Sequence, residues 1–475
     1  MLRAVLRCLP AGVALTLLGA CAQQAAPIEP PEAAPQARAC PAGVPAETRC
    51  LGGQDSAGAF YLIAIPRDWQ GELVLHSHGG PFLGAPTMQR IEEDLQRWSI
   101  MPRAGYAWAG SSFRQGGVAV RAAAEDTERL RRLFVRHVAT PKLTILHGQS
   151  WGASVAAKAA EMFTAGEPSA PSAGPLPRTA QPPWGSVGAP AGGGRPYDGV
   201  LLTSGVLAGG TRAYDFRLDL RVVYQYLCRN HPRADEPAYP LWRGLPAGST
   251  LTQAELARRV NDCLVLNRPA AERSPEQARK LKTLVDVLHI PERSLLGHLN
   301  WATFHFQDIA EKRSGGANVF GNIGVRYRGS DDDAALNAGV LRYAADPAAV
   351  ARFGADADPT GRIPVPVLTV HGIGDPTAFV EMQHSFAETM ARAGRAEALV
   401  QTFSDDREHS YLSDASYVAL LDALKAWASE GRKPTPAAVA QGCAAAQANF
   451  PSSCRFRPDY RPMALETRVP VRQRP

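Results

Sequence analysis

Short apolar runs alternate with amphipathic stretches along the first third of the chain. Each run is rich in aliphatic and aromatic residues and ends in glycine, serine or proline, a pattern that predicts a strand followed by a turn. The predicted strands are residues 58–66, 72–81, 104–113 and 143–148. Residues 88–100 and 118–139 predict helices, because apolar side chains recur there at helical spacing. This alternation predicts an α/β fold with a mainly parallel, doubly wound sheet covered by helices.

The same alternation returns later in the chain, after a long interval without it. The later predicted strands are residues 198–205, 364–372 and 398–403, and the last core helix is residues 413–429. Prolines bound the middle one of these strands, which is typical of a strand between two turns. The pattern therefore predicts one sheet domain built from residues 40–205 and 364–430.

Residues 206–363 hold helical patches, two cysteines and many aromatic side chains, but no comparable series of strands. A segment of this size between two sheet strands predicts a mostly helical cap. Rings such as Trp301, Phe304 and Phe320 fill either the interior of the cap or the wall of a substrate pocket, and the sequence leaves both open.

Two further segments depart from the core pattern. Residues 164–197 are rich in proline, glycine, serine and alanine, a composition that predicts a disordered surface insertion. Residues 431–475 follow the last core helix and contain two cysteines and a basic, proline-rich end. They predict an ordered C-terminal extension held by a disulfide.

The N-terminus has the features of an export signal. Arg3 and Arg7 precede a short apolar stretch that ends in Leu18-Gly19-Ala20-Cys21, which resembles the lipobox of bacterial lipoproteins. The resemblance implies a signal peptide at residues 1–20, a lipid on Cys21 and a membrane anchor without a membrane-spanning helix. Residues 21–39 then predict a disordered tether. The alternative is an ordinary secretion signal with an incidental cysteine.

The residue after Cys21 is alanine and not aspartate. In Gram-negative lipoproteins this choice favours the outer membrane, so we expect a lipid-anchored protein at the outer membrane, in the periplasm or at the cell surface. Membrane contact is then made through the lipid alone.

The cysteine count agrees with an oxidising compartment. With Cys8 in the signal and Cys21 lipidated, six cysteines remain, and proximity predicts three disulfides that each close a short loop. The predicted pairs are Cys40–Cys50, Cys228–Cys263 and Cys443–Cys454. Metal binding is the alternative, but the chain contains no C-x-x-C motif.

Charge and motif content exclude several classes of function. The net charge of +6 is spread over 475 residues without a dense basic block, which argues against nucleic-acid binding. No dinucleotide or phosphate-binding glycine motif occurs, so no cofactor is predicted. The acidic run at residues 331–333 fits a helix cap better than a calcium loop, and the His76-x-His78 pair fits a glycine turn better than zinc. No metal is predicted.

The clearest chemical motif is Gly148-Gln149-Ser150-Trp151-Gly152, which fits G-x-S-x-G between a predicted strand and a predicted helix. A serine is a weak nucleophile unless a base activates it, and the base needs an orienting acid. Asp375 follows the strand at 364–372, and His409 follows the strand at 398–403.

Other residues compete for the two partner roles. Asp405 and Asp406 compete with Asp375, but they lie close to His409 in one loop. The histidines His147, His371 and His384 lie at strand ends or within a helix, where packing explains them.

Four motifs in this order, HGGP, GQSWG, HGxxD and a histidine before the last helix, resemble the serine hydrolases of the α/β-hydrolase fold over roughly residues 58–163, 198–205 and 364–429. The resemblance implies Ser150 as nucleophile, His409 as general base and then acid, and Asp375 as its orienting acid. It also implies an oxyanion hole from the backbone N–H groups of Gly80 and Trp151, since Pro81 has none.

Substrate choice is less well determined by the sequence. HGGP together with GxSWG resembles prolyl aminopeptidases, but Phe82 and Ala153 stand where that branch usually has glycine. Those enzymes also need cap carboxylates, and none can be assigned. Hydrolysis of a small or polymeric carboxylic ester is the first expectation. The alternatives are a serine peptidase and a catalytically idle fold that binds an envelope component.

Overall fold

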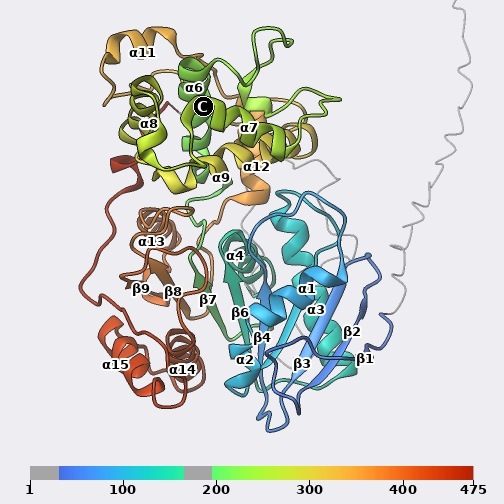
Figure 1. Ribbon diagram of the computed structural model, residues 1–475. Coiled ribbons are helices and arrows are strands. Elements are labelled where there is room, and N and C mark those ends of the chain that lie inside the picture. The colour runs from blue at the N-terminus through green and yellow to red at the C-terminus, as the bar shows by residue number, and fades with distance from the viewer. Residues whose placement is uncertain (1–31, 165–194, 474–475) are drawn as a thin grey trace, which may run out of the picture.

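The computed structural model describes residues 32–164 and 195–473 (Figure 1). The predicted signal peptide, Cys21 and all but the ends of the predicted insertion at 164–197 lie outside the described residues. At its C-terminal end the prediction of a disordered surface segment is wrong, because Tyr197 is fully buried and donates a 2.6 Å hydrogen bond to the Glu128 carboxylate.

The core of the described chain is a nine-stranded, mostly parallel sheet, which confirms the predicted fold class. The strands are β1 (Gln36–Arg38), β2 (Arg49–Gln54), β3 (Phe60–Ile65), β4 (Glu72–Ser77), β5 (Ala107–Ser111), β6 (Leu143–Gln149), β7 (Gly199–Thr203), β8 (Val367–Gly372) and β9 (Leu399–Ser404). Their spatial order is β1-β2-β3-β5-β4-β6-β7-β8-β9. The six strands from β5 to β9 in this order run parallel, while β1, β2 and β3 pair antiparallel.

The sequence patterns missed β1 and β2, and the predicted tether at 21–39 is wrong at its C-terminal end. Residues 36–38 pair with residues 50–52 as an exposed edge strand. Main-chain hydrogen bonds make this pairing, so it needs no apolar side chains and leaves no periodic signal. In β2, Gly52 and Gly53 interrupt the alternation that would have marked a strand.

Helices cover both faces of the sheet because its strands alternate their side chains between two cores. Leu73 and Leu75 of β4 face one core, which is shared with α3 (Val120–His137), α4 (Trp151–Phe163) and α13 (Met382–Arg392). Val74 faces the other core, which is shared with α1 (Met88–Arg97) and α14 (Asp414–Glu430). Because the strands from β5 to β9 are parallel, the loops that follow them lie at the same edge of the sheet.

All of the chain between β7 and β8 is described, and it consists of helices joined by loops, without a strand. Its helices are α5 (Gly210–Ala213), α6 (Asp215–Cys228), α7 (Gln253–Leu264), α8 (Pro275–Leu288), α9 (Leu295–Asn300), α10 (Phe306–Asp308), α11 (Asp333–Gly339) and α12 (Pro347–Ala357). Figure 1 shows them gathered beyond the carboxyl ends of the parallel strands. We call this group, which the sequence predicts at residues 206–363, the cap.

The C-terminal extension spans from the sheet domain to the cap. Helix α15 (Pro436–Ala446) packs on α14, and Figure 1 shows the chain then running back along the molecule to end beside the cap helices. There the Arg472 guanidinium binds the carboxylates of Asp215 and Asp219 on α6. Arg468 lies 3.0 Å from the Glu381 carboxylate.

The three cysteine pairs that proximity predicts are all disulfides in the structure. Their Cα–Cα separations are 5.3 Å for Cys40–Cys50, 5.8 Å for Cys228–Cys263 and 5.9 Å for Cys443–Cys454. The second joins the end of α6 to the end of α7, so it ties two helices of the cap together.

Removing the cap disulfide should destabilise the protein more than removing either of the others. It closes the longest loop, with a sequence separation of 35 against 10 and 11, and a cross-link removes more chain entropy from the unfolded state as its loop grows. We expect Cys228→Ser with Cys263→Ser to lower the free energy of unfolding by about 3–4 kcal/mol. Denaturant unfolding measures this loss beside that of a second variant, Cys443→Ser with Cys454→Ser. An equal or larger loss of unfolding free energy in the second variant would contradict the prediction.

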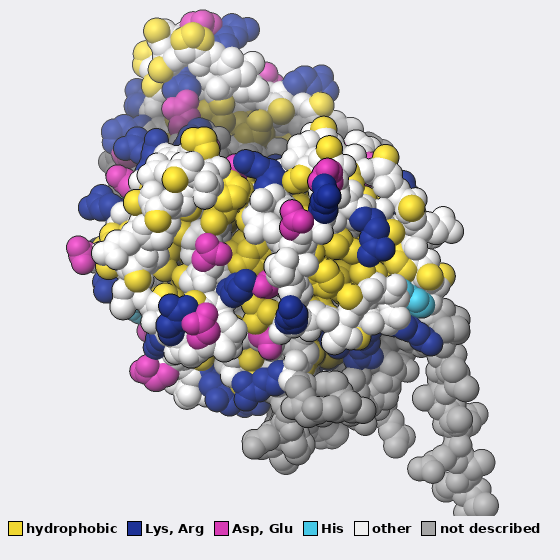
Figure 2. All heavy atoms as spheres, turned by 90° about the horizontal axis from the view of Figure 1, so that it is seen from below, with side chains coloured by type: hydrophobic (Ala, Val, Ile, Leu, Met, Phe, Trp, Pro, Cys, Tyr) yellow, Lys and Arg dark blue, Asp and Glu magenta, His cyan; other side chains and the backbone are white. Residues whose placement is uncertain are grey.

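The surface carries charges of both signs. Figure 2 shows the end of the molecule opposite the cap, where lysine and arginine side chains are interspersed with acidic ones. Within residues 32–164 and 195–473, no helix combines the length and the apolar composition needed to cross a membrane.

Candidate active site

Ser150 lies on a sharp turn between β6 and α4, at the carboxyl edge of the sheet. Its φ of 57° and ψ of −120° are unfavourable for a residue with a side chain, at a cost on the order of 1–3 kcal/mol. Two backbone bonds hold the turn: the Ser150 N–H donates to the Thr203 carbonyl at 2.9 Å, and its carbonyl accepts from the Val206 N–H at 3.1 Å. The strain lifts the hydroxyl out of the strand toward the loops around it.

The two glycines of the motif are required by close backbone contacts. A Cβ on Gly148 would overlap the Gly152 carbonyl oxygen, and a Cβ on Gly152 would overlap the Ser77 carbonyl oxygen. These neighbours are main-chain atoms of a strand and a helix, so neither can move aside cheaply. The close packing of β4, β6 and α4 therefore leaves no space for a side chain at either glycine of G-x-S-x-G.

Gly152→Ala should lower the free energy of unfolding by about 3 kcal/mol, because the added methyl group forces α4 away from β4. Denaturant unfolding measures the loss. Gly297→Ala is the matched control: Gly297 lies in helix α9 with open space around it, so alanine there should be neutral or slightly stabilising. Equal stability of the two variants would show that α4 has freedom to shift.

Two more loops bring Asp375 and His409 to the same edge. Asp375 follows β8, His409 follows β9, and the three side chains form one hydrogen-bonded chain. His409 Nε2 lies 2.8 Å from Ser150 Oγ, and His409 Nδ1 lies 2.7 Å from Asp375 Oδ2. Because a carboxylate can only accept, Nδ1 carries the ring proton and Nε2 is left to accept the serine proton.

Asp375 is held as a buried carboxylate. Its Oδ1 accepts from the N–H groups of Thr377 at 2.8 Å and Ala378 at 3.0 Å, and its Oδ2 also lies 3.4 Å from His371 Nε2. Burial alone would raise the pKa of Asp375, but the facing imidazoles of His409 and His371 outweigh burial and hold it below its usual range. The carboxylate is therefore charged at neutral pH and fixes the ring of His409.

The competing residues lie elsewhere. Asp405 is exposed and lies 3.6 Å from the Arg457 guanidinium, while Asp406 binds Ser404 Oγ. His384 lies 3.9 Å from Glu388 within α13. Within the described chain, no hydrogen bond or ion pair joins His409 to Asp405 or Asp406.

The loop after β4 lies beside Ser150. Gly80 has a φ of +69°, and a Cβ on Gly79 would overlap the side chain of Gln149, the residue before Ser150. Trp151 opens helix α4, and the first N–H groups of a helix have no partner within it. The positive end of the α4 dipole also lies at this point, which favours a negative charge on an atom bound to Ser150.

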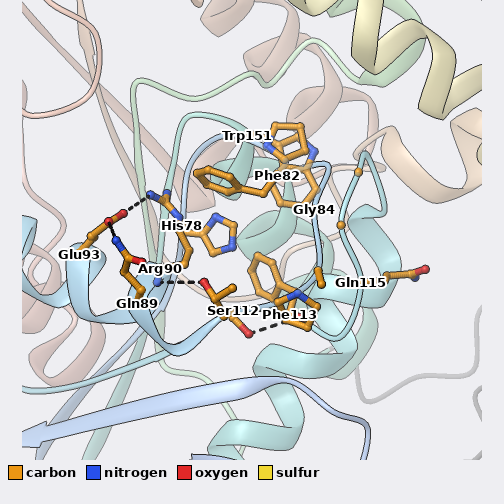
Figure 3. A pocket seen from close by; sticks show the side chains of 16 residues that line it. His78, Phe82, Gly84, Gln89, Arg90, Glu93, Ser112, Phe113, Gln115 and Trp151 are labelled. Carbon is orange, nitrogen blue, oxygen red and sulfur yellow. Dashed lines mark hydrogen bonds and ion pairs between the residues drawn. The ribbon is translucent and has the colours of Figure 1, made fainter. Parts of the chain in front are cut away.

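A cavity of about 290 Å³ opens beside this loop, between residues 78–93, residues 112–117 and Trp151. Figure 3 shows the rings of His78, Phe82, Phe113 and Trp151 around it. Burial lowers the pKa of His78 to about 3, so this ring is neutral at physiological pH. Phe113 has a φ of +58°, a second strained residue at the site. Four rings thus line the cavity together with small and uncharged polar residues, and Arg90 and Glu93 lie at one side.

The cap aromatics that the sequence singled out do not line this cavity. Phe320 is fully buried and stacks on Phe306 inside the cap, with ring centroids 4.5 Å apart. Trp301 is half-buried and lies flat on the His305 ring at 4.8 Å. The pocket-lining rings Phe82 and Phe113 were not predicted, because no periodic signal marks a loop residue.

The cap contacts the loops around Ser150 through two histidines, of which His298 is buried and His305 half-buried. His298 Nε2 donates to the Pro376 carbonyl at 2.9 Å, next to Asp375. His305 Nε2 donates to the Pro81 carbonyl at 2.8 Å, next to Gly80. Burial lowers the pKa of His298 to about 3 and that of His305 to about 4, so both bind as neutral rings. They fix the position of the cap over the loops on either side of Ser150.

In the part of the chain that the structure describes, no group of three or more histidine, cysteine or acidic side chains is arranged to hold a metal ion. The polar atoms around Ser150 are instead those of a serine, an imidazole, a carboxylate and main-chain N–H groups. This set can activate a nucleophile and stabilise an oxyanion.

A sheet of this topology, with a strained serine turn after β6 and a cap between β7 and β8, defines the α/β-hydrolase fold. No family model matches the chain, and a comparison with curated protein sequences returns no match. Solved structures similar to it include feruloyl esterase B from Aspergillus oryzae, with 13% identity, 85% of this chain and 87% of that chain covered, and a TM-score of 0.40.

Two further structures lie in the same range. An esterase from Aspergillus oryzae is 13% identical over 82% of this chain and 81% of that chain, with a TM-score of 0.38. A rice cell wall degrading esterase from Xanthomonas oryzae is 12% identical over 76% of this chain and 83% of that chain, with a TM-score of 0.34. Likeness of this degree assigns neither activity nor substrate to this chain.

Proposed function

We propose that the protein is a serine hydrolase that cleaves carboxylic esters through an acyl-enzyme intermediate. One observation carries the proposal: Asp375, His409 and Ser150 form an unbroken hydrogen-bonded chain, with contacts of 2.7 Å and 2.8 Å, at a strained turn beside an aromatic cavity. If Ser150 had only a structural role, there would be no reason for its strained backbone or for the hydrogen bond from its hydroxyl to His409.

In the proposed reaction, Ser150 Oγ attacks the ester carbonyl while His409 Nε2 takes its proton. Asp375 stabilises the imidazolium that forms. The N–H groups of Gly80 and Trp151 bind the oxyanion of the tetrahedral intermediate. His409 then gives its proton to the leaving alcohol, and a water molecule activated by the same ring releases the acid from Ser150.

Ester hydrolysis is favoured over aminopeptidase activity by the charges near the site. An aminopeptidase must hold the ammonium group of its substrate, which calls for free carboxylates on the cap. Asp308, the cap carboxylate that borders the cavity loop at Gly117, is already 3.2 Å from the Arg313 guanidinium and accepts from the Val118 N–H. The aromatic rings of the cavity suit an uncharged acyl or alcohol group instead.

The proposal is tested with p-nitrophenyl esters of short acids beside aminoacyl p-nitroanilides, using the wild-type protein and Ser150→Ala. We expect release of nitrophenol from the esters, little release of nitroaniline, and loss of both in the variant. Faster cleavage of the anilides would identify a peptidase. Hydrolysis unaffected by Ser150→Ala would overturn the proposed nucleophile.

We further propose that the chain is exported and lipid-anchored through Cys21. Three disulfides in the described residues support an oxidising compartment. Cys21→Ser should abolish labelling by a radioactive fatty acid and release the protein from membranes, while hydrolysis of a soluble ester by the released enzyme keeps its wild-type rate. Labelling that survives the substitution would contradict the anchor at Cys21, and a large loss of intrinsic rate would show that the membrane takes part in catalysis.

A further inference from the structure

Arg217 is a buried cation for which the described chain provides no acidic partner. It lies in the first turn of α6 with 4% of its surface exposed, and its Nε and Nη1 have no hydrogen-bond acceptor. Burial lowers the pKa of Arg217 to about 10, so the guanidinium is still charged at neutral pH. An unpaired buried charge costs several kcal/mol, and the positive end of the α6 dipole adds to that cost.

Three other buried arginines each have at least one hydrogen-bond acceptor or acidic partner, although Arg221 and Arg472 also keep donors without one. Arg472 binds Asp215 and Asp219, and Arg259 binds Glu236. Arg221, one turn further along α6, donates to the Tyr239 hydroxyl at 3.2 Å and to a main-chain carbonyl. Among the described residues, Arg217 instead contacts aromatic rings, and its buried donors would reach a bound group only once that group displaces the side chains around them.

Aromatic side chains hold the guanidinium in place. Its central carbon lies 4.2 Å from the ring centre of Trp301, 4.8 Å from that of Phe216 and 4.9 Å from that of Tyr214. Such rings stabilise a cation without neutralising it and leave its N–H groups unused. A side chain held in this way loses little further entropy when an anion binds.

Two chains of contacts place Arg217 over the proposed active site. Through Trp301 it lies next to His305, which binds the carbonyl of Pro81 in the oxyanion loop. Through Phe216 it lies next to His298, whose ring centre is 4.9 Å from that of Phe216.

His298 in turn binds the carbonyl of Pro376, beside Asp375. Burial is the main reason why the pKa values of His298 and His305 are low, and the positive charge of nearby Arg217 lowers both further. The oxyanion loop and the acid loop flank Ser150, so a group bound between the two histidines lies above the nucleophile. In addition, the segment that leads from β7 to α6 is tied to the active site, because the Val206 N–H donates a hydrogen bond to the Ser150 carbonyl.

We propose that Arg217 binds a carboxylate carried by the substrate, so that the enzyme selects esters with a free acid group near the scissile bond. The inference rests on the proposed ester hydrolysis and adds the class of substrate to it. A planar guanidinium suits a carboxylate because it can donate two parallel hydrogen bonds, a geometry that lysine cannot copy. The bound carboxylate would supply the negative charge that Arg217 lacks among the described residues.

The test compares charged esters with neutral twins that differ by one methyl group. On the acid side, the pair is p-nitrophenyl hemiglutarate and its methyl ester. On the alcohol side, the pair is 4-acetoxybenzoate and its methyl ester. We expect kcat/KM of the wild-type enzyme to favour the charged member of one pair by at least about tenfold, which also shows on which side of the ester the carboxylate lies.

Arg217→Met keeps the length of the side chain and removes the charge. It should lower kcat/KM for the preferred charged ester by about 30-fold or more, mainly through KM, because a hydrogen-bonded charge pair is lost. Hydrolysis of the neutral twin should change by less than about threefold, and the melting temperature should not fall. The control is Arg221→Met, which removes a buried arginine from the same helix and should keep the charge preference whatever its stability.

Equal losses on both members of a pair, or a wild-type enzyme without charge preference, would overturn the role of Arg217 and leave the hydrolase intact. Absence of Ser150-dependent cleavage of all four esters would mean instead that the proposed function is wrong, and this inference with it.

Discussion

His409→Ala should reduce kcat for ester hydrolysis by about a millionfold, close to the loss from Ser150→Ala. Without the imidazole nothing takes the proton from Ser150 Oγ, to which Nε2 is hydrogen-bonded at 2.8 Å. The leaving alcohol also loses its proton donor. Because serine and histidine act as one unit, Ser150→Ala combined with His409→Ala should be no slower than either single variant.

Rates are measured with a p-nitrophenyl ester under saturation, beside circular dichroism to show that each variant is folded. The matched control is His384→Ala. His384 is a part-exposed histidine on helix α13, 3.9 Å from Glu388, and should leave the rate unchanged. A His409→Ala enzyme within about a hundredfold of wild type would show that another group acts as the base.

Asp375→Asn should reduce kcat by about 10⁴-fold. The amide is nearly isosteric, so the loop after β8 keeps its shape, but it can offer an N–H to His409 Nδ1 in place of a lone pair. The ring is then held in the tautomer that carries its proton on Nε2, the atom that must accept from Ser150. The buried carboxylate that stabilises the imidazolium is also lost.

Asp405→Asn is the control for this prediction, because it makes the same chemical change on an exposed residue of the loop that carries His409. It should leave kcat within about twofold of wild type, and Asp406→Asn should do the same or lose only stability through Ser404. A large loss in either control with an active Asp375→Asn enzyme would reassign the acid.

Much of the fold was predictable because it depends on local patterns. Leu73, Val74 and Leu75 alternate between two cores, and each of the seven predicted strands is present. The G-x-S-x-G spacing was also informative, because its two glycines are required by main-chain atoms a few residues away or on an adjacent strand. The order of serine, acid and histidine then follows from the order of β6, β8 and β9.

What sequence reasoning missed depends on contacts between distant segments. β1 pairs with β2 through main-chain bonds, so residues 36–38 carry no apolar period. Phe113 lines the cavity through a φ of +58° that no propensity predicts for phenylalanine. The fold surrounds Arg217 with three rings and gives it no carboxylate partner among the described residues. The residues next to it along α6 do not predict this environment.

The most direct test of the proposed hydrolase is covalent labelling of the full-length protein with a fluorophosphonate, followed by peptide mass spectrometry. Such a reagent reacts with a serine that a neighbouring base activates, and it spares ordinary serines. We predict one equivalent of label on Ser150, with no label on Ser150→Ala or on His409→Ala. A folded wild-type protein that stays unlabelled, or a label on any other serine, would contradict the assignment of Ser150 as the nucleophile.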